Sequence, residues 1–343
     1  MNYTCIPDLT YIDTPDFLLT DMHIITGIST PIHFLGLYCI IFKTPKQMRS
    51  VKWYMLILHI YVMIFDYSYT IMTVPFVLSP FAAGFPLGLL RLTGMSVVAQ
   101  SIYFIIIYFF MLNGIVSIFE NRFYKICSFT SKNTWKFWRI VWLAGHYVIE
   151  VLLILPIKCF VPEQTHALQY VFQNLPCLPR YIYDGPVYVV AEDITYHFSF
   201  IFSLHVLICF EVIFFFGYLI RSGRQQLKGK TMSQRTFQLQ KKFFIALISQ
   251  VCVPSVFFII PLIYVVITIL TKYYNQGYLN IAFTIIAMHG LVSTSAMLSL
   301  HQPYRETILN TFQKTPRTLS KIQNLNDKRL HRCSARVAHI SPG

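Results

Sequence analysis

Seven stretches of the chain are almost free of charged residues and are long enough to cross a lipid bilayer. A transmembrane helix needs about 20 mostly apolar residues, because the hydrocarbon core is about 30 Å thick. Only Asp66, Glu150 and Glu211 interrupt the apolar runs, and no Lys or Arg lies inside them, although Arg139 and Lys158 stand at the two ends of the fourth predicted span. The pattern predicts seven spans, at about residues 22–42, 53–78, 92–119, 139–159, 195–220, 243–270 and 278–300.

The lengths and the uniform hydrophobicity of these runs exclude two other fold classes. Buried helices of a soluble protein would carry polar faces, which these seven runs lack. Strands of a membrane barrel would be about ten residues long and would alternate apolar and polar positions. The expected fold class is therefore an all-α membrane protein, a seven-transmembrane helix bundle.

The composition supports a membrane protein, and the charge distribution predicts its orientation. The 343 residues are 55% hydrophobic and only 12% charged, with a net charge of +14. Of the 28 Lys and Arg residues, 24 fall in alternate segments between the spans, and the other segments hold only four. Because basic residues accumulate on the cytosolic side, we expect an extracellular amino terminus and a cytosolic carboxyl terminus. The positive charge therefore indicates cytosolic loops on a lipid bilayer, not a nucleic-acid partner.

The predicted orientation also assigns the segments at the two ends of the chain to a side of the membrane. Residues 1–21 form the extracellular amino-terminal segment, and the bundle occupies 22–303. The first 42 residues contain no Lys or Arg, so the first span is expected to be retained and not cleaved as a signal peptide. An apolar stripe predicts a short interfacial helix over 304–314, and the basic segment 315–343 is expected to be a disordered cytosolic tail.

The eight cysteines have no metal-binding spacing, and we predict neither a metal nor another cofactor. Cys5 and Cys177 both fall in predicted extracellular segments, where an oxidising environment permits a disulfide. Cys159, at the outer end of the fourth span, is the competing partner for Cys177. Asn2 begins an Asn-Tyr-Thr sequon and is a candidate glycosylation site, although such a short match also arises by chance.

Ionisable residues inside spans are costly, and each of them is a candidate for function. His59 and Asp66 lie seven residues apart, on one face of the second span. His146 and Glu150 are four apart and can pair directly, whereas Glu211 has no partner within its own helix. Interhelical hydrogen bonds that hold the bundle together are the simpler interpretation of this polar core. A polar hub around Asp66 that rearranges on activation is the alternative.

Short motifs at corresponding places give the chain its resemblance to a known family. They are Thr44-Pro45 and the run Val51 to Met55 before and at the start of span two, Glu120 to Phe123 at the end of span three, Pro254 and Pro261 in span six, and Pro303 to Arg305 after span seven. In these motifs the sequence resembles the nematode serpentine chemoreceptors of class H, over the chain to about residue 314. It lacks the Asp-Arg-Tyr and Asn-Pro-x-x-Tyr motifs of rhodopsin-like receptors.

The resemblance implies a G-protein-coupled receptor in the plasma membrane, in sensory cilia of chemosensory neurons. It implies helix kinks at Pro254 and Pro261 and a G-protein switch formed by Glu120, Arg122, Tyr304 and Arg305. Glu120 lies at a helix C-terminus, where the dipole disfavours an anion, so a cationic partner on a neighbouring helix is expected. A plain positive-inside anchor is the alternative role for Arg122.

A ligand site is expected between the outer halves of the helices, where an external stimulus arrives. Depth in the spans indicates an apolar site for a small hydrophobic molecule, with these candidates: Gln100, Tyr103, Phe200, Phe258, Tyr264 and Phe283. Aromatic residues at such positions are also typical of plain core packing.

A signalling receptor without enzyme activity is the favoured function. A transporter that uses the intramembrane residues Asp66, Glu150 and Glu211 is the alternative. The odd number of spans and the lack of a detectable repeat between the halves both argue against a transporter. The eleven His residues lack the spacing of a metal cluster, which argues against an intramembrane enzyme. The sequence does not decide the oligomeric state.

Overall fold

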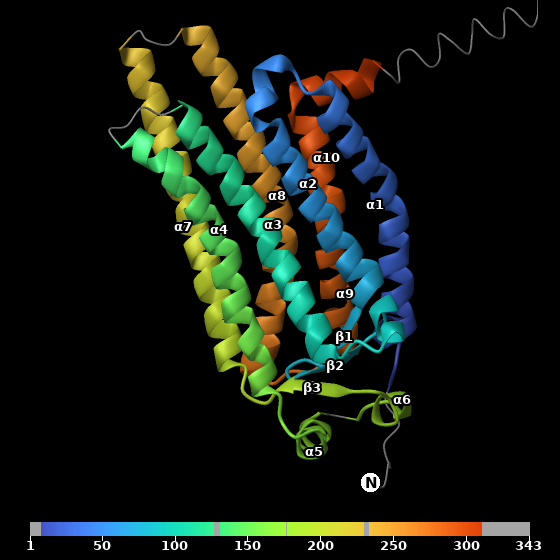
Figure 1. Ribbon diagram of the computed structural model, residues 1–343. Coiled ribbons are helices and arrows are strands. Elements are labelled where there is room, and N and C mark those ends of the chain that lie inside the picture. Colours follow the sequence, from blue (N-terminus) through green and yellow to red (C-terminus); the bar gives the residue numbers. More distant parts are fainter. Residues whose placement is uncertain (1–7, 127–130, 176, 230–232, 311–343) are drawn as a thin grey trace, which may run out of the picture.

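A computed structural model describes residues 8–126, 131–175, 177–229 and 233–310. The chain forms a bundle of long, roughly parallel helices (Figure 1). The spans are α1 (Pro15–Lys43), α2 (Arg49–Tyr67), α3 (Val97–Ile126), α4 (Lys132–Ile154), α7 (Thr195–Lys228), α8 (Gln234–Thr271), and α9 (Gln276–Ala287) with α10 (His289–Leu300). Two spans continue beyond their α-helices. A wider, π-helical turn η3 (Ser68–Thr73) extends α2, and a tighter, 3₁₀ turn η5 (Leu155–Phe160) extends α4.

The described helices confirm the predicted fold class. Six of them are long and apolar enough to cross a membrane, with α9 and α10 counted as one, and α8 adds an apolar stretch over Ser255–Thr271. The outward faces are apolar as well, since Ile213 and Leu152 are 69% and 62% exposed. Many large apolar side chains are exposed along α1, α2, α4, α7 and α8, and an apolar surface this extensive is typical of contact with lipid. The chain is therefore an all-α bundle of seven spans.

Local sequence signals set several helix ends. Thr14 caps α1, because its hydroxyl accepts a hydrogen bond from the Phe17 N–H at 3.2 Å and Pro15 occupies the first helical position. Asn275 caps α9 by accepting from the Tyr278 N–H at 2.9 Å. These side chains satisfy backbone N–H groups that have no partner within the helix.

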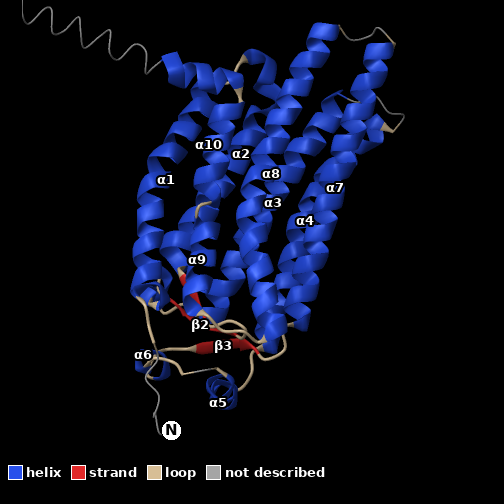
Figure 2. Cartoon of the chain, turned by 180° about the vertical axis from the view of Figure 1, so that it is seen from behind, coloured by secondary structure: helices blue, strands red, loops and turns tan. Residues whose placement is uncertain are grey.

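A small sheet closes one end of the bundle, which we call the sheet end. It consists of β1 (Pro75–Val77), β2 (Ala82–Pro86) and β3 (Tyr188–Ala191) in antiparallel order, with Phe76 opposite Phe85. Two short helices, α5 (Gln164–Asn174) and α6 (Arg180–Tyr183), lie beside it (Figure 2). A side chain on Gly84 would overlap the Phe76 carbonyl, so this close strand pairing requires glycine there.

The sheet shifts two of the predicted span boundaries. The second span was expected to reach residue 78, but helical structure ends at Thr73 and β1 begins at Pro75. The third was expected from residue 92, but α3 begins at Val97, after a 3₁₀ turn η4 (Leu89–Thr93). Proline cannot donate the hydrogen bond that would continue the helix, and hydropathy alone does not register this constraint.

The opposite end of the bundle carries the basic segments between the spans, and we call it the basic end. Residues 302–310 form a further helix that crosses this end after α10 (Figure 1). The first part of the predicted interfacial helix is therefore helical, and its placement at a membrane surface remains a prediction. Residues 311–314 and the predicted tail 315–343 lie outside the described residues.

Candidate functional site

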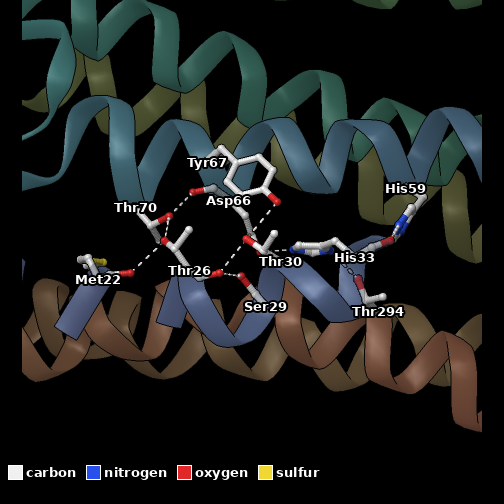
Figure 3. A network of polar contacts seen from close by, with 10 residues as sticks. All are labelled: Met22, Thr26, Ser29, Thr30, His33, His59, Asp66, Tyr67, Thr70 and Thr294. Atoms are coloured by element: carbon white, nitrogen blue, oxygen red, sulfur yellow. Dashed lines mark hydrogen bonds and ion pairs between the residues drawn. The ribbon is translucent and has the colours of Figure 1, made fainter. Parts of the chain in front are cut away.

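A buried polar network links α1, α2 and α10 near the middle of the bundle (Figure 3). Its centre is His33, whose Nε2 lies 2.9 Å from Asp66 Oδ2 and whose Nδ1 lies 2.9 Å from Thr294 Oγ1. His59 Nε2 lies 2.9 Å from the His33 carbonyl oxygen. All four side chains are buried. The shared face predicted for His59 and Asp66 is present, and both residues contact the same residue of α1.

Hydroxyl groups extend this network toward the sheet end. The Thr70 hydroxyl donates to the Asp66 carbonyl at 2.8 Å, and the Thr26 and Thr70 hydroxyls are 2.7 Å apart. The Tyr67 hydroxyl donates to Thr30 at 3.1 Å (Figure 3). Each bond joins α1 to α2 or closes a helix turn. A relative movement of the two helices would therefore break several bonds together.

Two glycines allow the three helices to approach this closely. A side chain on Gly290 of α10 would overlap the Asp66 carboxylate. A Cβ on Gly36 of α1 would lie 2.8 Å from the Thr294 methyl group and 2.9 Å from His59 Cε1. Small residues at helix interfaces let backbones pack closely in membranes. The network therefore depends on glycine as much as on its polar groups.

A second polar cluster lies at the basic end, between α3 and α4. Glu120 is completely buried, and its Oε2 lies 2.5 Å from Arg139 Nη2. The Trp135 indole N–H donates to Glu120 Oε1 at 2.9 Å. The Arg139 guanidinium lies over the Tyr124 ring, 4.4 Å from its centre. Glu120 thus has the cationic partner on a neighbouring helix that its position at a helix end predicts.

The other three residues of the predicted switch differ in exposure. Tyr304 is completely buried, and its hydroxyl lies 2.8 Å from Thr44 Oγ1 of the α1 C-terminus. Arg122 is partly buried, and Arg305 is exposed. In this state Tyr304 holds the helix of residues 302–310 against α1, and Arg305 is open to the basic end.

The remaining intramembrane acids pair differently from the prediction. His146 of α4 contacts Glu211 of α7, with Nε2 to Oε1 at 3.0 Å. Glu150 instead accepts a hydrogen bond from Asn113 Nδ2 of α3 at 2.7 Å. The predicted pair of His146 with Glu150 is therefore wrong, and the missing partner of Glu211 is His146. A spacing of four residues permits a contact within one helix, but here Glu211 of α7 lies within hydrogen-bond distance of His146, and Asn113 of α3 within that of Glu150.

A family model for the "Serpentine type 7TM GPCR chemoreceptor Srh" matches residues 13–314 of the chain. The chain belongs to this family. It is also 25% identical over 322 residues to "Serpentine receptor class H-72" of Caenorhabditis elegans, an alignment that covers 91% of this chain and 90% of that protein. The resemblance inferred from short motifs is thereby confirmed, and the chain is a multi-span membrane protein of a chemoreceptor family.

The receptor holds the six residues of the predicted ligand site inside the bundle, mostly in contact with other side chains. Gln100 donates from Nε2 to the Met95 carbonyl at 2.9 Å, and the Tyr103 hydroxyl lies 2.6 Å from Ser68 Oγ. The remaining four are packed as follows: Phe200 is buried, Phe258 packs on the His289 ring at 4.5 Å, the Tyr264 hydroxyl donates to the Asn275 carbonyl, and Phe283 packs against Tyr69.

Among the hollows of the described part of the receptor, two are of similar size. One, of about 300 Å³, lies at the sheet end between Asp13, Tyr181 and Tyr274. The other, of about 330 Å³, lies on the side of the bundle around Trp142 and Glu211. None of the six predicted ligand-site residues lines either hollow. The ligand site therefore remains a prediction.

The cysteine, glycosylation and proline predictions are only partly covered by the described residues. Cys177 is disulfide-bonded and Cys159 is a free thiol, so these two are not joined. Cys5 and Asn2 lie outside the described residues. Helix α8 continues through both proline positions, Pro261 is buried, and the Pro254 side chain is outside the described part of the structure. The kinks and the Cys5–Cys177 pairing stay predictions.

Sequence reasoning missed three partners that complete these clusters, His33, Arg139 and Asn113. His33 is the most informative omission, since it is a titratable residue in the middle of a predicted first span that contains no Asp, Glu, Lys or Arg. The described residues contain no group of three or more His, Cys, Asp and Glu residues placed to hold a metal ion.

Proposed function

We propose that this receptor detects a small hydrophobic stimulus from outside the cell and activates a heterotrimeric G protein at its basic end. The observation that carries the proposal is the buried Glu120–Arg139 ion pair, which ties α3 to α4 at that end. An ion pair removed from water is stable only while its geometry is kept. It therefore suits a switch with one closed arrangement and one in which the pair is broken.

The proposed switch couples this pair to two other contacts of the basic end. Tyr304 is bonded to Thr44, and Asn121 donates from Nδ2 to the Ser50 carbonyl at 3.0 Å. These contacts hold α1, α2, α3 and the helix of residues 302–310 together in the closed state. Separation of the helices would present the partly buried Arg122, beside the already exposed Arg305, to an acidic surface of the G protein, where Arg forms paired hydrogen bonds.

The stimulus is proposed to act from the sheet end, near the six predicted pocket residues, through the network of His33, Asp66 and Thr294. That network joins α1, α2 and α10, the same helices whose ends meet at the basic end. A ligand that binds one arrangement of these helices better than the other shifts the equilibrium by its difference in affinity. We place the receptor in the plasma membrane of chemosensory cilia.

The experiment is a G-protein activation assay in cells that express the receptor together with a set of Gα subunits. A panel of volatile and small hydrophobic molecules is screened, and the response is normalised to surface receptor. Arg122→Ala and Arg122→Lys are the informative variants. A topological anchor tolerates Lys, whereas a docking residue that needs the planar guanidinium does not.

The expected result is a stimulus-dependent response that both variants reduce at equal surface level. Wild-type responses in both variants would exclude the docking role of Arg122. Solute flux across the membrane of vesicles that contain the receptor and no G protein would instead support a transporter.

A further inference from the structure

We propose that the lateral hollow between α3, α4 and α7 binds a small lipophilic alcohol that enters from the bilayer. The hollow measures about 330 Å³, and its walls are aromatic apart from one carboxylate. The residues that the proposal uses are Phe123, Trp135, Trp142, Glu211, Phe214 and Phe215. None of the predicted ligand residues lines this site, and neither Glu120 nor Arg139 of the proposed switch does.

The opening of the hollow faces the side of the bundle. Phe214 is 51% exposed and Phe210, on the same wall, is 65% exposed, as expected for side chains in contact with lipid. Phe123 and Trp135 line the hollow toward the basic end, whereas Phe210, Glu211 and Phe214 lie inside the predicted span 195–220, where the exposed face of α7 contacts lipid. A ligand therefore reaches the hollow through the lipid phase, which concentrates lipophilic molecules.

Glu211 determines the chemistry of the occupant's polar group. A carboxylate accepts hydrogen bonds only, up to about four of them. His146 Nε2 lies 3.0 and 3.1 Å from its two oxygens, which leaves acceptor capacity for a donor from the hollow. A hydroxyl supplies that donor without a formal charge. An ammonium would supply it too, but a charged group at such depth is far more costly to bring out of water.

The volume and the walls determine the rest of the molecule. At the packing density of protein interiors, a hollow of this size holds about a dozen non-hydrogen atoms. Phe123 and Phe215 pack with ring centres 5.3 Å apart, and Trp142 and Phe215 with centres 5.7 Å apart. These rings offer flat apolar surfaces to an alkyl or aryl body. The occupant is thus an alkyl or aryl alcohol of about this size.

The hollow is connected to the ion pair at the basic end by one side chain. Trp135 lines the hollow, and its indole N–H is the group that donates to Glu120. A bound alcohol would contact the residue that holds the ion pair in place. An effect on signalling therefore rests on the proposed function, whereas binding itself does not.

The test measures binding by fluorescence quenching on purified full-length receptor in lipid vesicles, without a G protein. The probe is 10-bromodecan-1-ol, whose bromine quenches tryptophan on contact. Trp53 and Trp138 are 63% and 53% exposed, so they are replaced by Phe to remove their quenching by probe dissolved in the lipid. The remaining signal comes from Trp135 and Trp142, both of which line the hollow.

The expected result is saturable quenching by the alcohol and only a linear, unsaturated response to 1-bromodecane, which has no donor. Glu211→Leu should weaken binding by about tenfold or more, because it removes a hydrogen bond to a charged acceptor. Glu211→Gln, which keeps an acceptor of the same shape, should weaken binding less.

Three outcomes would overturn the proposal. Equal, unsaturated quenching by the two probes would show partition into lipid and no site. Saturable binding of 10-bromodecylamine but not of the alcohol would assign the hollow to a cation. Unchanged affinity in Glu211→Leu would exclude the carboxylate. The comparison of probes uses a receptor with Glu at position 211. It therefore tests whether the hollow binds the alcohol even if the Leu variant does not fold. A receptor that binds the alcohol but activates no G protein would refute only the proposed function.

Discussion

At the scale of single residues, the intramembrane carboxylates each have a partner on another helix. Asp66 contacts His33, Glu150 contacts Asn113, and Glu211 contacts His146. An ionisable group in a membrane interior needs such a partner, because no water is present to solvate it. The single-residue predictions therefore concern what happens when these arrangements are disturbed.

Gly290→Ala should destabilise the receptor. The added methyl group would overlap the Asp66 carboxylate and push α10 from α2, at a cost of about 1 to 3 kcal/mol typical of overpacking. Gly217→Ala is the matched control, since a Cβ there meets nothing within 4 Å. The thermal midpoint of the purified receptor should fall for the first variant and hold or rise for the second. Equal midpoints in the two variants would contradict the close approach of α10 to α2.

Arg139→Ala should raise ligand-independent signalling. It leaves Glu120 buried without its cation, which destabilises the closed arrangement of α3 and α4. Lys136→Ala removes one positive charge from the same helix at an exposed position and should leave basal activity unchanged. Basal G-protein activation per surface receptor is the measurement. A basal level in Arg139→Ala equal to that of Lys136→Ala would argue against the ion pair as a restraint.

At the scale of elements, the sheet end differs most from what hydropathy predicts. Apolar residues continue beyond the second span, but Pro75 and the pairing of β1 with β2 place them in a hairpin. Val74, between η3 and β1, adopts a positive φ of 39°. These features arise from backbone geometry and not from hydrophobicity. A prediction from hydropathy therefore places the end of the second span too far along the chain.

Helix α5 should lose its N-terminal cap in acid. Glu163 accepts from the backbone N–H groups of His166 at 2.9 Å and Thr165 at 3.0 Å, and these bonds hold the pKa of its carboxyl below its usual range. A carboxyl with a lowered pKa stabilises the folded element above its ordinary pKa of 4.5, and the contribution is lost as the pH falls through the lowered value.

Hydrogen exchange of the peptide that covers residues 164–174 measures this cap. Glu163→Ala should speed the exchange of the first-turn amides at neutral pH, and Asn at the same position should restore protection. Exchange that is equally slow in wild type and Glu163→Ala at neutral pH would show that the cap is dispensable.

At the scale of the whole molecule, the two ends of the bundle have opposite character. The sheet end holds the described acids Asp13, Asp16, Glu163 and Asp184, and the basic end holds most of the Lys and Arg residues. This asymmetry fixes the expected topology, because basic segments resist translocation.

An amino-terminal tag should therefore be accessible to antibody on intact cells. A carboxyl-terminal tag should be detected only after permeabilisation. The reverse pattern would place the basic end outside and remove the basis for G-protein coupling.

Cys177→Ser should lower surface expression. A disulfide that joins Cys177 to Cys5 would tie the amino-terminal segment to the sheet end and stabilise by about 2 to 4 kcal/mol through the unfolded state. Peptide mapping under non-reducing conditions identifies the partner. A bond from Cys177 to any cysteine other than Cys5 would refute the pairing.

The sequence by itself determined the class of the molecule and its division into spans. Length and hydrophobicity are properties of contiguous residues, so seven apolar runs and 24 basic residues on alternate segments already specify a membrane bundle with two unlike ends. The motif from Glu120 to Phe123 indicated the last turns of α3, which ends at Ile126, and the need of Glu120 for a cation.

Only the tertiary structure decided which groups meet. His146 is four residues from Glu150, yet it contacts Glu211, which is 65 residues away, because α4 and α7 are placed side by side. In the same way, His33 contacts Asp66, and Arg139 contacts Glu120, across helix interfaces. Such contacts depend on how helices rotate and pack, which is set by the summed fit of many side chains and by glycines such as Gly290, and no local pattern encodes that sum.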